Sequence, residues 1–307
     1  MVIVTKDRET RLAFALEALA EQSLDSDRFE VVVVRATERS SPRAKAPPGL
    51  DVRFLEWAKS PNIAAQRNAG WRAARAPIVA FTDDDCRPSR VWLENLVEPG
   101  STDIRQGRTE PDPDEGHLLW GLARSQHVTE PSHWYQTCNI AYPKDALERL
   151  GGFDPMFSQL GEDADLGLRA EEMGLKLTYS DSALVWHAVL PRTPATAVRE
   201  ALRRDTVPAL IARHRRARDR IFLRVFWKQS HAGIVLGLGG VAFARRRPFV
   251  GLLLLVPYLS LGFDRRAHRS PRGFVRFARH QPARLLVDLA ELLATLRGAV
   301  RARSFVV

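Results

Sequence analysis

Cysteine is scarce in this chain: its 307 residues include only two, Cys86 and Cys138. A disulfide framework needs several cysteines, and a cysteine-based zinc site needs closely spaced ones. The sequence therefore excludes a disulfide scaffold and predicts no zinc site built on cysteine. Two unpaired thiols fit the reducing conditions of a cytosol.

Acidic residues are scarce in the last third of the chain. Residues 1–200 hold 24 Lys and Arg against 31 Asp and Glu, a net charge of −7, whereas residues 201–307 hold 22 against 5, a net charge of +17. A basic segment can bind nucleic acid without specificity. Long apolar runs interrupt this one, so we expect a membrane surface as its partner and no specific nucleic acid.

Apolar runs and helical patterns alternate along the first 190 residues, as in a globular α/β chain. The runs predict buried strands over Met1–Thr5, Phe29–Val34, Val52–Trp57 and Pro77–Thr82. Helical spacing follows over Arg11–Gln22, Asn62–Ala74 and Glu162–Met173. Strand, helix and strand in succession predict a mostly parallel sheet with flanking helices. Residues 100–116 are polar and contain two prolines, which predicts a loop.

Three consecutive aspartates, Asp83–Asp85, directly follow the fourth predicted strand. Open α/β sheets bind ligands at the carboxyl ends of their strands. Adjacent carboxylates repel one another, and a hard divalent cation relieves that repulsion. The triplet therefore suggests a metal site, although a solvated cluster capping the next helix gives the same pattern.

Further polar residues lie at other predicted element ends. Glu162 and Asp163 begin a helix after a glycine, His187 follows a short strand, and Arg67 and Asn68 lie in a helix of small residues. Each alone has an ordinary explanation, because a single histidine is usually packed and a single arginine is usually a surface cation. Their order along the chain carries more information than any one of them.

That ordered set resembles the family 2 glycosyltransferases of the GT-A fold, in particular bacterial members with a C-terminal membrane-associating region. The matching motifs are Ala65–Gly70, Phe81–Asp85, Thr137–Ala141, Gly151–Pro155 and Gly161–Leu166. The resemblance covers residues 1–190. It implies a nucleotide-sugar donor, a divalent metal (Mn²⁺ or Mg²⁺) and inversion at the anomeric carbon.

The resemblance also implies roles for individual residues. Asp163 matches the general base that deprotonates the acceptor hydroxyl. The metal ligands that the resemblance implies are Asp83, Asp85 and His187. Contacts to the nucleotide-sugar are implied for Thr5, Arg67, Asp83, Asp84, Asn139 and Glu162. The reaction expected from these roles is a single displacement without a covalent enzyme intermediate.

One position departs from the family pattern. The family usually has an aspartate directly after the second strand, where it contacts the donor nucleotide, and here Arg35 follows Val34. The donor is then either held differently or bound poorly. Arg35 itself reads as a loop cation, and we assign it no role.

The sequence suggests two domains, a glycosyltransferase domain over residues 1–193 and a basic helical tail over 194–307. The tail is expected to hold a helix over Thr196–Arg220, an apolar hairpin over 232–263 and an amphipathic helix over 284–301. The second arm of the hairpin has 16 residues, or about 24 Å as a helix, against about 30 Å for a bilayer core. We therefore favour a peripheral or re-entrant hairpin at the cytoplasmic face of the membrane over two full spans.

The leucine stripe of the predicted helix over 284–301 has a second explanation, because it would serve equally for packing on the catalytic domain or in a dimer.

The expected function is transfer of a sugar to a glycan or lipid-linked acceptor in cell-envelope synthesis. Two alternatives stay open. One is a catalytically weak membrane scaffold, suggested by Arg35. The other is a sugar-phosphate nucleotidyltransferase, although Lys6–Thr10 lacks the glycines of a phosphate loop.

Overall fold

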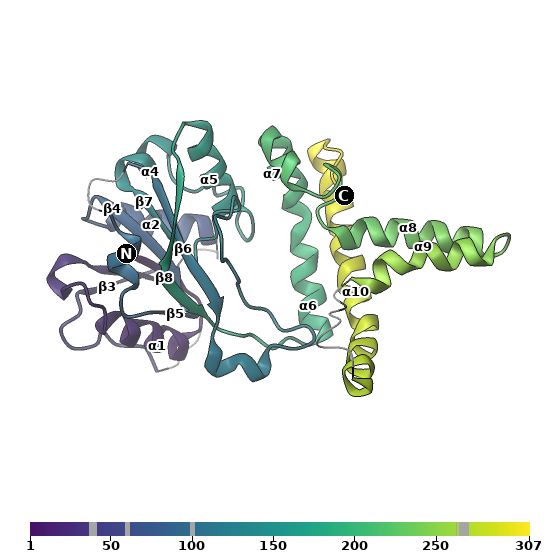
Figure 1. Cartoon of the computed structure of the whole chain (residues 1–307). Coiled ribbons are helices and arrows are strands. Elements are labelled where there is room, and N and C mark those ends of the chain that lie inside the picture. Colours follow the sequence, from purple (N-terminus) through teal and green to yellow (C-terminus); the bar gives the residue numbers. More distant parts are fainter. Residues whose placement is uncertain (37–41, 59–61, 99–101, 262, 264–269) are drawn as a thin grey trace. The chain divides into compact units, whose positions relative to one another are not determined.

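The computed structural model describes residues 1–36, 42–58, 62–98, 102–261, 263 and 270–307. They form two compact units, drawn in Figure 1. Unit 1 comprises residues 1–119 and 123–190, and unit 2 comprises residues 120–122 and 191–307. Each unit is described below by itself.

Unit 1 is built on a mixed sheet with eight strands among the described residues, in the order β3-β2-β1-β4-β7-β6-β8-β5. The strands are β1 Val2–Thr5, β2 Val31–Arg35, β3 Val52–Glu56, β4 Ile78–Asp83, β5 Cys86–Pro88, β6 Ile104–Pro111, β7 Asn139–Pro143 and β8 Leu177–His187. Strands β1 to β4 run parallel, β7 runs against both β4 and β6, β6 and β8 are parallel, and β5 runs against β8. This arrangement confirms the predicted α/β class, with parallel pairs in the majority.

The continuous apolar runs of β1 and β2 arise because helices cover both faces of the sheet. The helices of unit 1 are α1 Glu9–Ala20, α2 Ile63–Ala73, α3 Trp92–Leu96, α4 Lys144–Leu150 and α5 Glu162–Glu172, with two short 3-10 turns, η1 Ser26–Arg28 and η2 Pro113–Leu118. Ile3 and Val33 pack with leucines of α1 and α3. Val2 points the other way, where a Cβ on Gly70 of α2 would lie only 2.4 Å from its Cγ1. Because neighbouring side chains of a strand alternate between faces, every position must be apolar.

The loop predicted over residues 100–116 is wrong for its central part, which forms strand β6, while residues 100 and 101 lie outside the described part. Its sequence hides the strand because two of its buried side chains, Gln106 and Thr109, are polar. Gly107 is required there, since a Cβ would lie 2.3 Å from the carbonyl oxygen of Ala183. Pairing with β7 and β8 thus overrides a weak local preference.

Unit 2 is helical. Its described segments are α6 Pro194–Ala201, η3 Leu202–Thr206, α7 Val207–Arg213, η4 Arg215–Arg220, α8 Gln229–Ala244, α9 Pro248–Ser260 and α10 Pro271–Ala302. The single bent helix predicted over Thr196–Arg220 is therefore broken into four segments. Pro208 lies in the first turn of α7, where a proline costs no hydrogen bond because the first amides of a helix have no partner within it.

The amphipathic helix predicted over 284–301 is the C-terminal part of the longer α10. Its leucines do not share one environment: Leu292 is buried, whereas Leu286 and Leu293 are exposed. The buried face also carries Glu291, whose carboxylate accepts a hydrogen bond from Lys228 at 2.7 Å. The helix therefore packs within unit 2 through a face that the leucine spacing did not identify.

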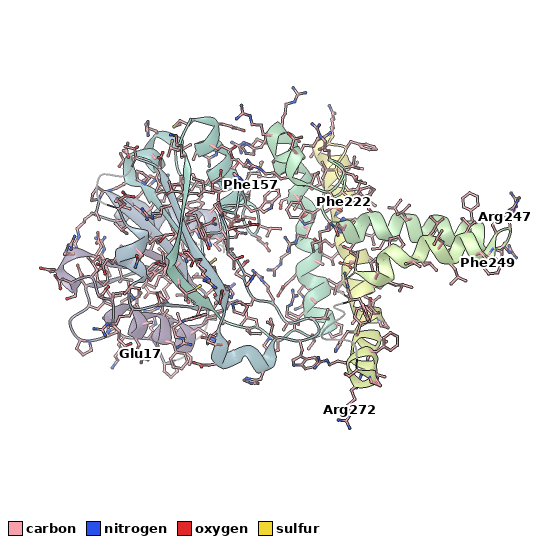
Figure 2. All side chains as sticks on the ribbon, in the orientation of Figure 1. Glu17, Phe157, Phe222, Arg247, Phe249 and Arg272 are labelled. Carbon is pink, nitrogen blue, oxygen red and sulfur yellow. The ribbon has the colours of Figure 1, made fainter. Side chains whose placement is uncertain are left out.

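Helices α8 and α9 lie side by side and project from the rest of unit 2 (Figure 1). Their backbones approach closely, because a Cβ on Gly240 would lie 2.7 Å from the carbonyl oxygen of Gly251. Apolar side chains cover their outer surface: Phe249 is 85% exposed and lies with Arg247 near the turn that joins the helices (Figure 2). Within the described part of the chain, no helix combines the length and the apolar character needed to cross a membrane.

Candidate active site

The site forms where β1 and β4 end at the same edge of the sheet. These parallel neighbours pair Val4 with Asp83, so the residues that follow each strand emerge together. The Thr5 hydroxyl donates a hydrogen bond of 2.6 Å to Oδ2 of Asp84. A residue from the first strand and one from the acidic triplet are thereby fixed side by side, as expected for the carboxyl edge of an α/β sheet.

Arg8 neutralises part of the triplet, and the sequence analysis did not identify it. Its guanidinium lies 3.2 Å from Oδ1 of Asp84 and 2.7 Å from Oδ2 of Asp85. Burial raises the pKa of Asp84 to about 7, although Arg8 opposes that rise. Arg8 could have been identified from its position in the sequence. It follows β1 by three residues and must therefore lie at the same edge of the sheet as Asp84.

Arg67 connects the triplet to the second carboxylate pair. It is buried in α2, donates to Oε1 of Glu162, and lies 3.3 Å from Oδ1 of Asp83. The other carboxylate oxygen of Glu162 is buried without a hydrogen-bond partner among the described residues. Arg67 therefore holds Asp83 and Glu162 together and leaves one acceptor atom of Glu162 free.

Asp163 lies at the start of α5, which begins after Gly161 in the left-handed conformation at φ +96°. Its side chain is partly exposed, and its Oδ1 accepts a hydrogen bond from the amide of Ala164. Burial and then the neighbouring Glu162 carboxylate raise the pKa of Asp163 to about 7, with Arg67 opposing them. A carboxylate with such a pKa is well suited to accept a proton near neutral pH.

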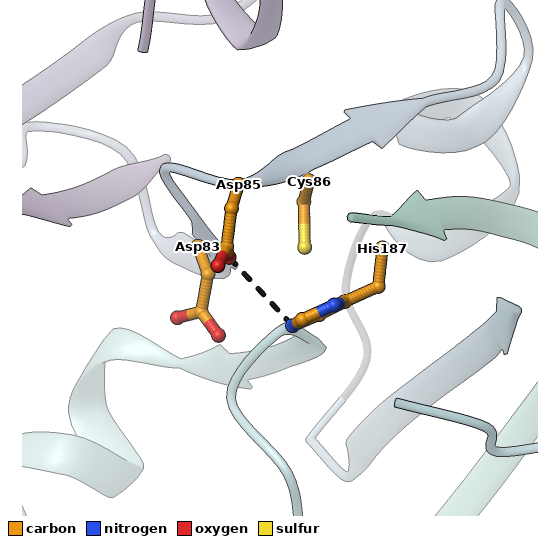
Figure 3. A group of neighbouring side chains, drawn as sticks. All are labelled: Asp83, Asp85, Cys86 and His187. Carbon is orange, nitrogen blue, oxygen red and sulfur yellow. Dashed lines mark ion pairs between the residues drawn. The ribbon is translucent and has the colours of Figure 1, made fainter. Parts of the chain in front are cut away.

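A second group of side chains gathers on the other side of the triplet, shown in Figure 3. One donor atom each from Asp83, Asp85, Cys86 and His187 lies within 4.8 Å of all the others. His187 is the last residue of β8, which pairs with β5 so that Cys86 lies opposite it. The structure thus brings together the three residues predicted to bind the metal and adds a thiol.

The residues present fit a divalent cation. The Nδ1–H of His187 donates to the carbonyl oxygen of Ala188 at 2.8 Å, and the other ring nitrogen, Nε2, lies 3.6 Å from Asp85 Oδ1. Metal-binding histidines usually have their second nitrogen fixed in this way. Across the site the carboxylates are Asp83, Asp84, Asp85, Glu162 and Asp163, and the guanidiniums that contact them are Arg8 and Arg67. A divalent ion would offset the excess negative charge.

Asn139 does not join this group. Its side-chain amide donates to the carbonyl oxygens of Arg108 and Ala183, at 2.7 and 2.8 Å, and its Oδ1 accepts from the Trp92 indole at 2.8 Å. Both amide protons are used, and the residue is buried. The side chain predicted to contact the donor therefore ties β7 to β6, β8 and α3.

Arg35 is not a loop cation. It ends β2, is only 4% exposed, and stacks over the Phe54 ring with its guanidinium carbon 4.2 Å from the ring centroid. Its Nε lies 3.0 Å from the Glu9 carboxylate, and its Nη2 donates to the carbonyl oxygen of Ala44. The residue that departs from the family pattern is thus a buried structural ion pair, a role that single-sequence reasoning could not assign.

Replacing Arg35 tests this assignment. Arg35→Met should lower the free energy of unfolding by about 3 kcal/mol, because it removes the guanidinium that lies 3.0 Å from the buried Glu9 carboxylate. Urea unfolding of the single variant and of the double variant Glu9→Gln/Arg35→Met measures the effect. The double variant should recover most of the lost free energy of unfolding. A loss below about 1 kcal/mol in the single variant would contradict a buried structural ion pair, because that is the size expected for a surface ion pair.

Comparison with known proteins shows similarity to one family over the first half of the chain. Residues 1–150 match the family described as Glycosyl transferase family 2. The pre-mycofactocin glycosyltransferase of Mycobacterium tuberculosis is 29% identical over 179 residues, which cover 53% of this chain and 38% of that protein. The validoxylamine A glucosyltransferase of Streptomyces hygroscopicus is 27% identical over 225 residues, which cover 59% of this chain and 49% of that glucosyltransferase. The chain thus spans half or less of the length of these relatives.

A solved structure shows the same fold. The mannosyltransferase of Pyrobaculum calidifontis, in complex with GDP-Man and Mn²⁺, is similar with a TM-score of 0.55 and 18% sequence identity. The similarity covers 98% of this chain and 86% of that one. The ordered motifs and the match over residues 1–150 show that this part of the chain is similar to glycosyltransferase family 2, and the solved structure shows the same fold.

Proposed function

We propose that this chain transfers a sugar from a nucleotide-sugar donor to an acceptor hydroxyl, using a divalent cation, Mn²⁺ or Mg²⁺, held by Asp83, Asp85 and His187. The observation that carries the proposal is the convergence of these donor atoms within 4.8 Å at the carboxyl edge of the sheet. The similarity to named glycosyltransferases supports the reaction type, and the Mn²⁺ in the Pyrobaculum complex is in keeping with a metal.

The leaving group of this reaction is a nucleoside diphosphate, whose negative charge grows as the bond to the sugar breaks. A bound cation would stabilise that charge as a Lewis acid. The chain's own contributions are positional: Arg67 holds Asp83 toward Glu162, and Thr5 holds Asp84. We assign Thr5 and Asp84 to the nucleotide side of the donor because they lie where β1 and β4 end. Asn139 is given no donor contact, since its amide is fully used inside unit 1.

The attacking group is an acceptor hydroxyl, which is a weak nucleophile until its proton is removed. Asp163 accepts that proton, and its raised pKa makes it a stronger base than an ordinary carboxylate. The free oxygen of Glu162 is available to accept a hydrogen bond from a sugar hydroxyl. Direct attack on the anomeric carbon inverts its configuration and forms no covalent enzyme intermediate.

A nucleotide-sugar panel tests the reaction. UDP- and GDP-linked sugars are screened by thermal shift with Mn²⁺, because a ligand that binds the folded state raises the unfolding temperature. Release of nucleoside diphosphate from the best donor is then followed with Mn²⁺, with Mg²⁺ and after chelation. The proposal requires turnover that chelation abolishes, and binding without any turnover across acceptors would favour the scaffold alternative.

We further propose that unit 2 binds an anionic membrane surface, which suits a glycan or lipid-linked acceptor at the cytoplasmic face. The support is exposed apolar area combined with positive charge: Leu252 and Leu253 of α9 are 65% and 69% exposed, and Arg245–Arg247 follow α8. Exposed apolar patches rimmed by arginines are typical of interfacial binding.

Vesicle co-sedimentation of the full chain tests this placement. Binding should be stronger to phosphatidylglycerol vesicles than to phosphatidylcholine vesicles, and Leu252→Ser/Leu253→Ser should weaken it about tenfold or more, since each leucine contributes about 1.5 kcal/mol or more of apolar transfer. Leu223→Ser is the matched control, because Leu223 is equally exposed at 68% and lies outside α8 and α9. Equal binding of all three proteins would contradict the proposal.

A further inference from the structure

We infer that the thiol of Cys86 is a fourth ligand of the metal site and gives it a preference for Zn²⁺ or Co²⁺ over Mn²⁺ and Mg²⁺. The inference deepens the proposed function, on which it rests, because it concerns the same cation site. It also revises the expectation that a chain with two distant cysteines holds no metal through sulfur.

The geometry comes from the pairing of β5 with β8. Cys86 lies opposite His187 in that antiparallel pair, and its side chain points toward the space between Asp85 and His187 (Figure 3). The sulfur lies within 4.8 Å of the donor atoms of Asp83, Asp85 and His187. Ligands of one tetrahedral ion lie about 3.5 Å apart, given metal–ligand bonds of about 2.0–2.3 Å, so closure needs side-chain shifts of only about 1 Å.

The sulfur makes a weak contact that a metal bond would replace. The Cys86 thiol donates to the carbonyl oxygen of Cys138 over 3.8 Å, and the residue otherwise packs among apolar side chains of the core. The Nε2 of His187, a residue only 3% exposed, lies 3.6 Å from Oδ1 of Asp85 on the same side.

The donor set determines which ions bind best. Two carboxylates, one imidazole and one thiol form a mixed O₂NS set, and sulfur donors favour zinc-like ions, whereas Mg²⁺ and Mn²⁺ favour oxygen. Affinity for divalent ions also rises from Mn²⁺ through Co²⁺. As the metal–sulfur bond forms, the thiol proton passes to solvent, and no oxidant or reductant is needed. Zn²⁺ should therefore displace Mn²⁺ from this site.

Cobalt binding gives a readout that does not depend on activity. Titration of the metal-free chain with Co²⁺ should produce the near-ultraviolet charge-transfer band of a cobalt–thiolate bond. Cys86→Ser should abolish the band and weaken Zn²⁺ binding about tenfold or more, while Mn²⁺ affinity, measured by electron paramagnetic resonance, stays within about twofold because Mn²⁺ prefers oxygen. Cys138→Ser is the matched control, because Cys138 is the other buried thiol and lies outside the donor group, and it should keep the band.

Two outcomes overturn the inference. In the first, Co²⁺ binds to the unaltered chain without a thiolate band. In the second, Cys86→Ser keeps both the band and the Zn²⁺ affinity. If Mn²⁺ still binds and supports transfer in either case, the proposed function stands and only the thiol ligand is lost. If no divalent ion binds at all, the metal-dependent function fails with it.

Discussion

Asp163→Asn is expected to lower kcat by about 10³-fold, within the range that a positioned general base contributes. The amide cannot accept the proton of the acceptor hydroxyl, while the donor contacts proposed for Thr5 and Asp84 do not involve this side chain directly. KM for the donor should therefore change little. The measurement is the initial rate of nucleoside diphosphate release at saturating donor and Mn²⁺. Asp181→Asn, on an exposed carboxylate of the same unit, should retain full rate.

Because the pKa of Asp163 is raised, the stability of Asp163→Asn can be predicted, and measuring it distinguishes a catalytic defect of this variant from misfolding. Its pKa is about 7 in the folded chain and about 3.9 when unfolded. Between these values the folded state binds the extra proton, so stability falls as pH rises from about 4 to about 7 and stays lower above that. Asp163→Asn has no carboxyl group to titrate, so its stability does not fall in this way. Its free energy of unfolding at pH 8 should be at least as high as that of the parent. An Asn variant that is stable and retains more than about a tenth of the rate would exclude Asp163 as the base.

The same pKa predicts how activity depends on pH. Only the ionised carboxylate can act as the base, and kcat/KM reports pKa values of the free enzyme, so kcat/KM should rise with pH and reach half of its limiting value near about pH 7. A profile of kcat/KM measured from acid to weakly alkaline pH at donor concentrations below KM shows this directly. A profile that follows an ordinary carboxylate, with its midpoint near pH 4, would contradict the assigned environment of Asp163.

Asp85→Asn should abolish most of the metal-dependent rate, by about 10²-fold or more, because loss of the cation removes several kcal/mol of charge stabilisation. The carboxylate lies between Arg8 and His187, at 2.7 and 3.6 Å, so the substitution also weakens one of the two ion pairs that Arg8 makes with the triplet. Turnover against Mn²⁺ concentration measures the effect, and the variant should need far more Mn²⁺ for any rate. Asp114→Asn, on an exposed carboxylate of unit 1, serves as control. An Asp85→Asn enzyme with an unchanged Mn²⁺ response would remove Asp85 from the metal site.

The sequence predicted those parts of the fold that have a strong local signal. The apolar runs of β1, β2 and β4 mark the buried strands because helices cover both faces of that part of the sheet. Strand β6 was missed because its buried positions include Gln106 and Thr109, whose environment is supplied by β7 and β8. A polar strand of this kind becomes recognisable only from the strands beside it.

The candidate site also has features that the sequence could predict and features that it could not. Its acidic residues could be found because they follow predicted strands or begin a helix, positions that converge in an α/β sheet. Arg67 was also found, but its contact with Glu162, 95 positions away, could not be predicted, and neither could the contact of Arg8 with Asp84, 76 positions away. Asn139 shows the opposite case: its motif suggested a ligand contact, whereas both of its amide protons are used for internal hydrogen bonds.

Binding of Mn²⁺ in the presence and absence of a nucleoside diphosphate tests the central claim most directly. If side chains from distant stretches of sequence hold one cation against a pyrophosphate, each ligand must strengthen binding of the other by the same factor. Electron paramagnetic resonance of Mn²⁺ and calorimetry with UDP and GDP should therefore give matching enhancements in the unaltered chain, lost in Asp85→Asn. Mn²⁺ and both nucleotides binding independently of each other would contradict the account.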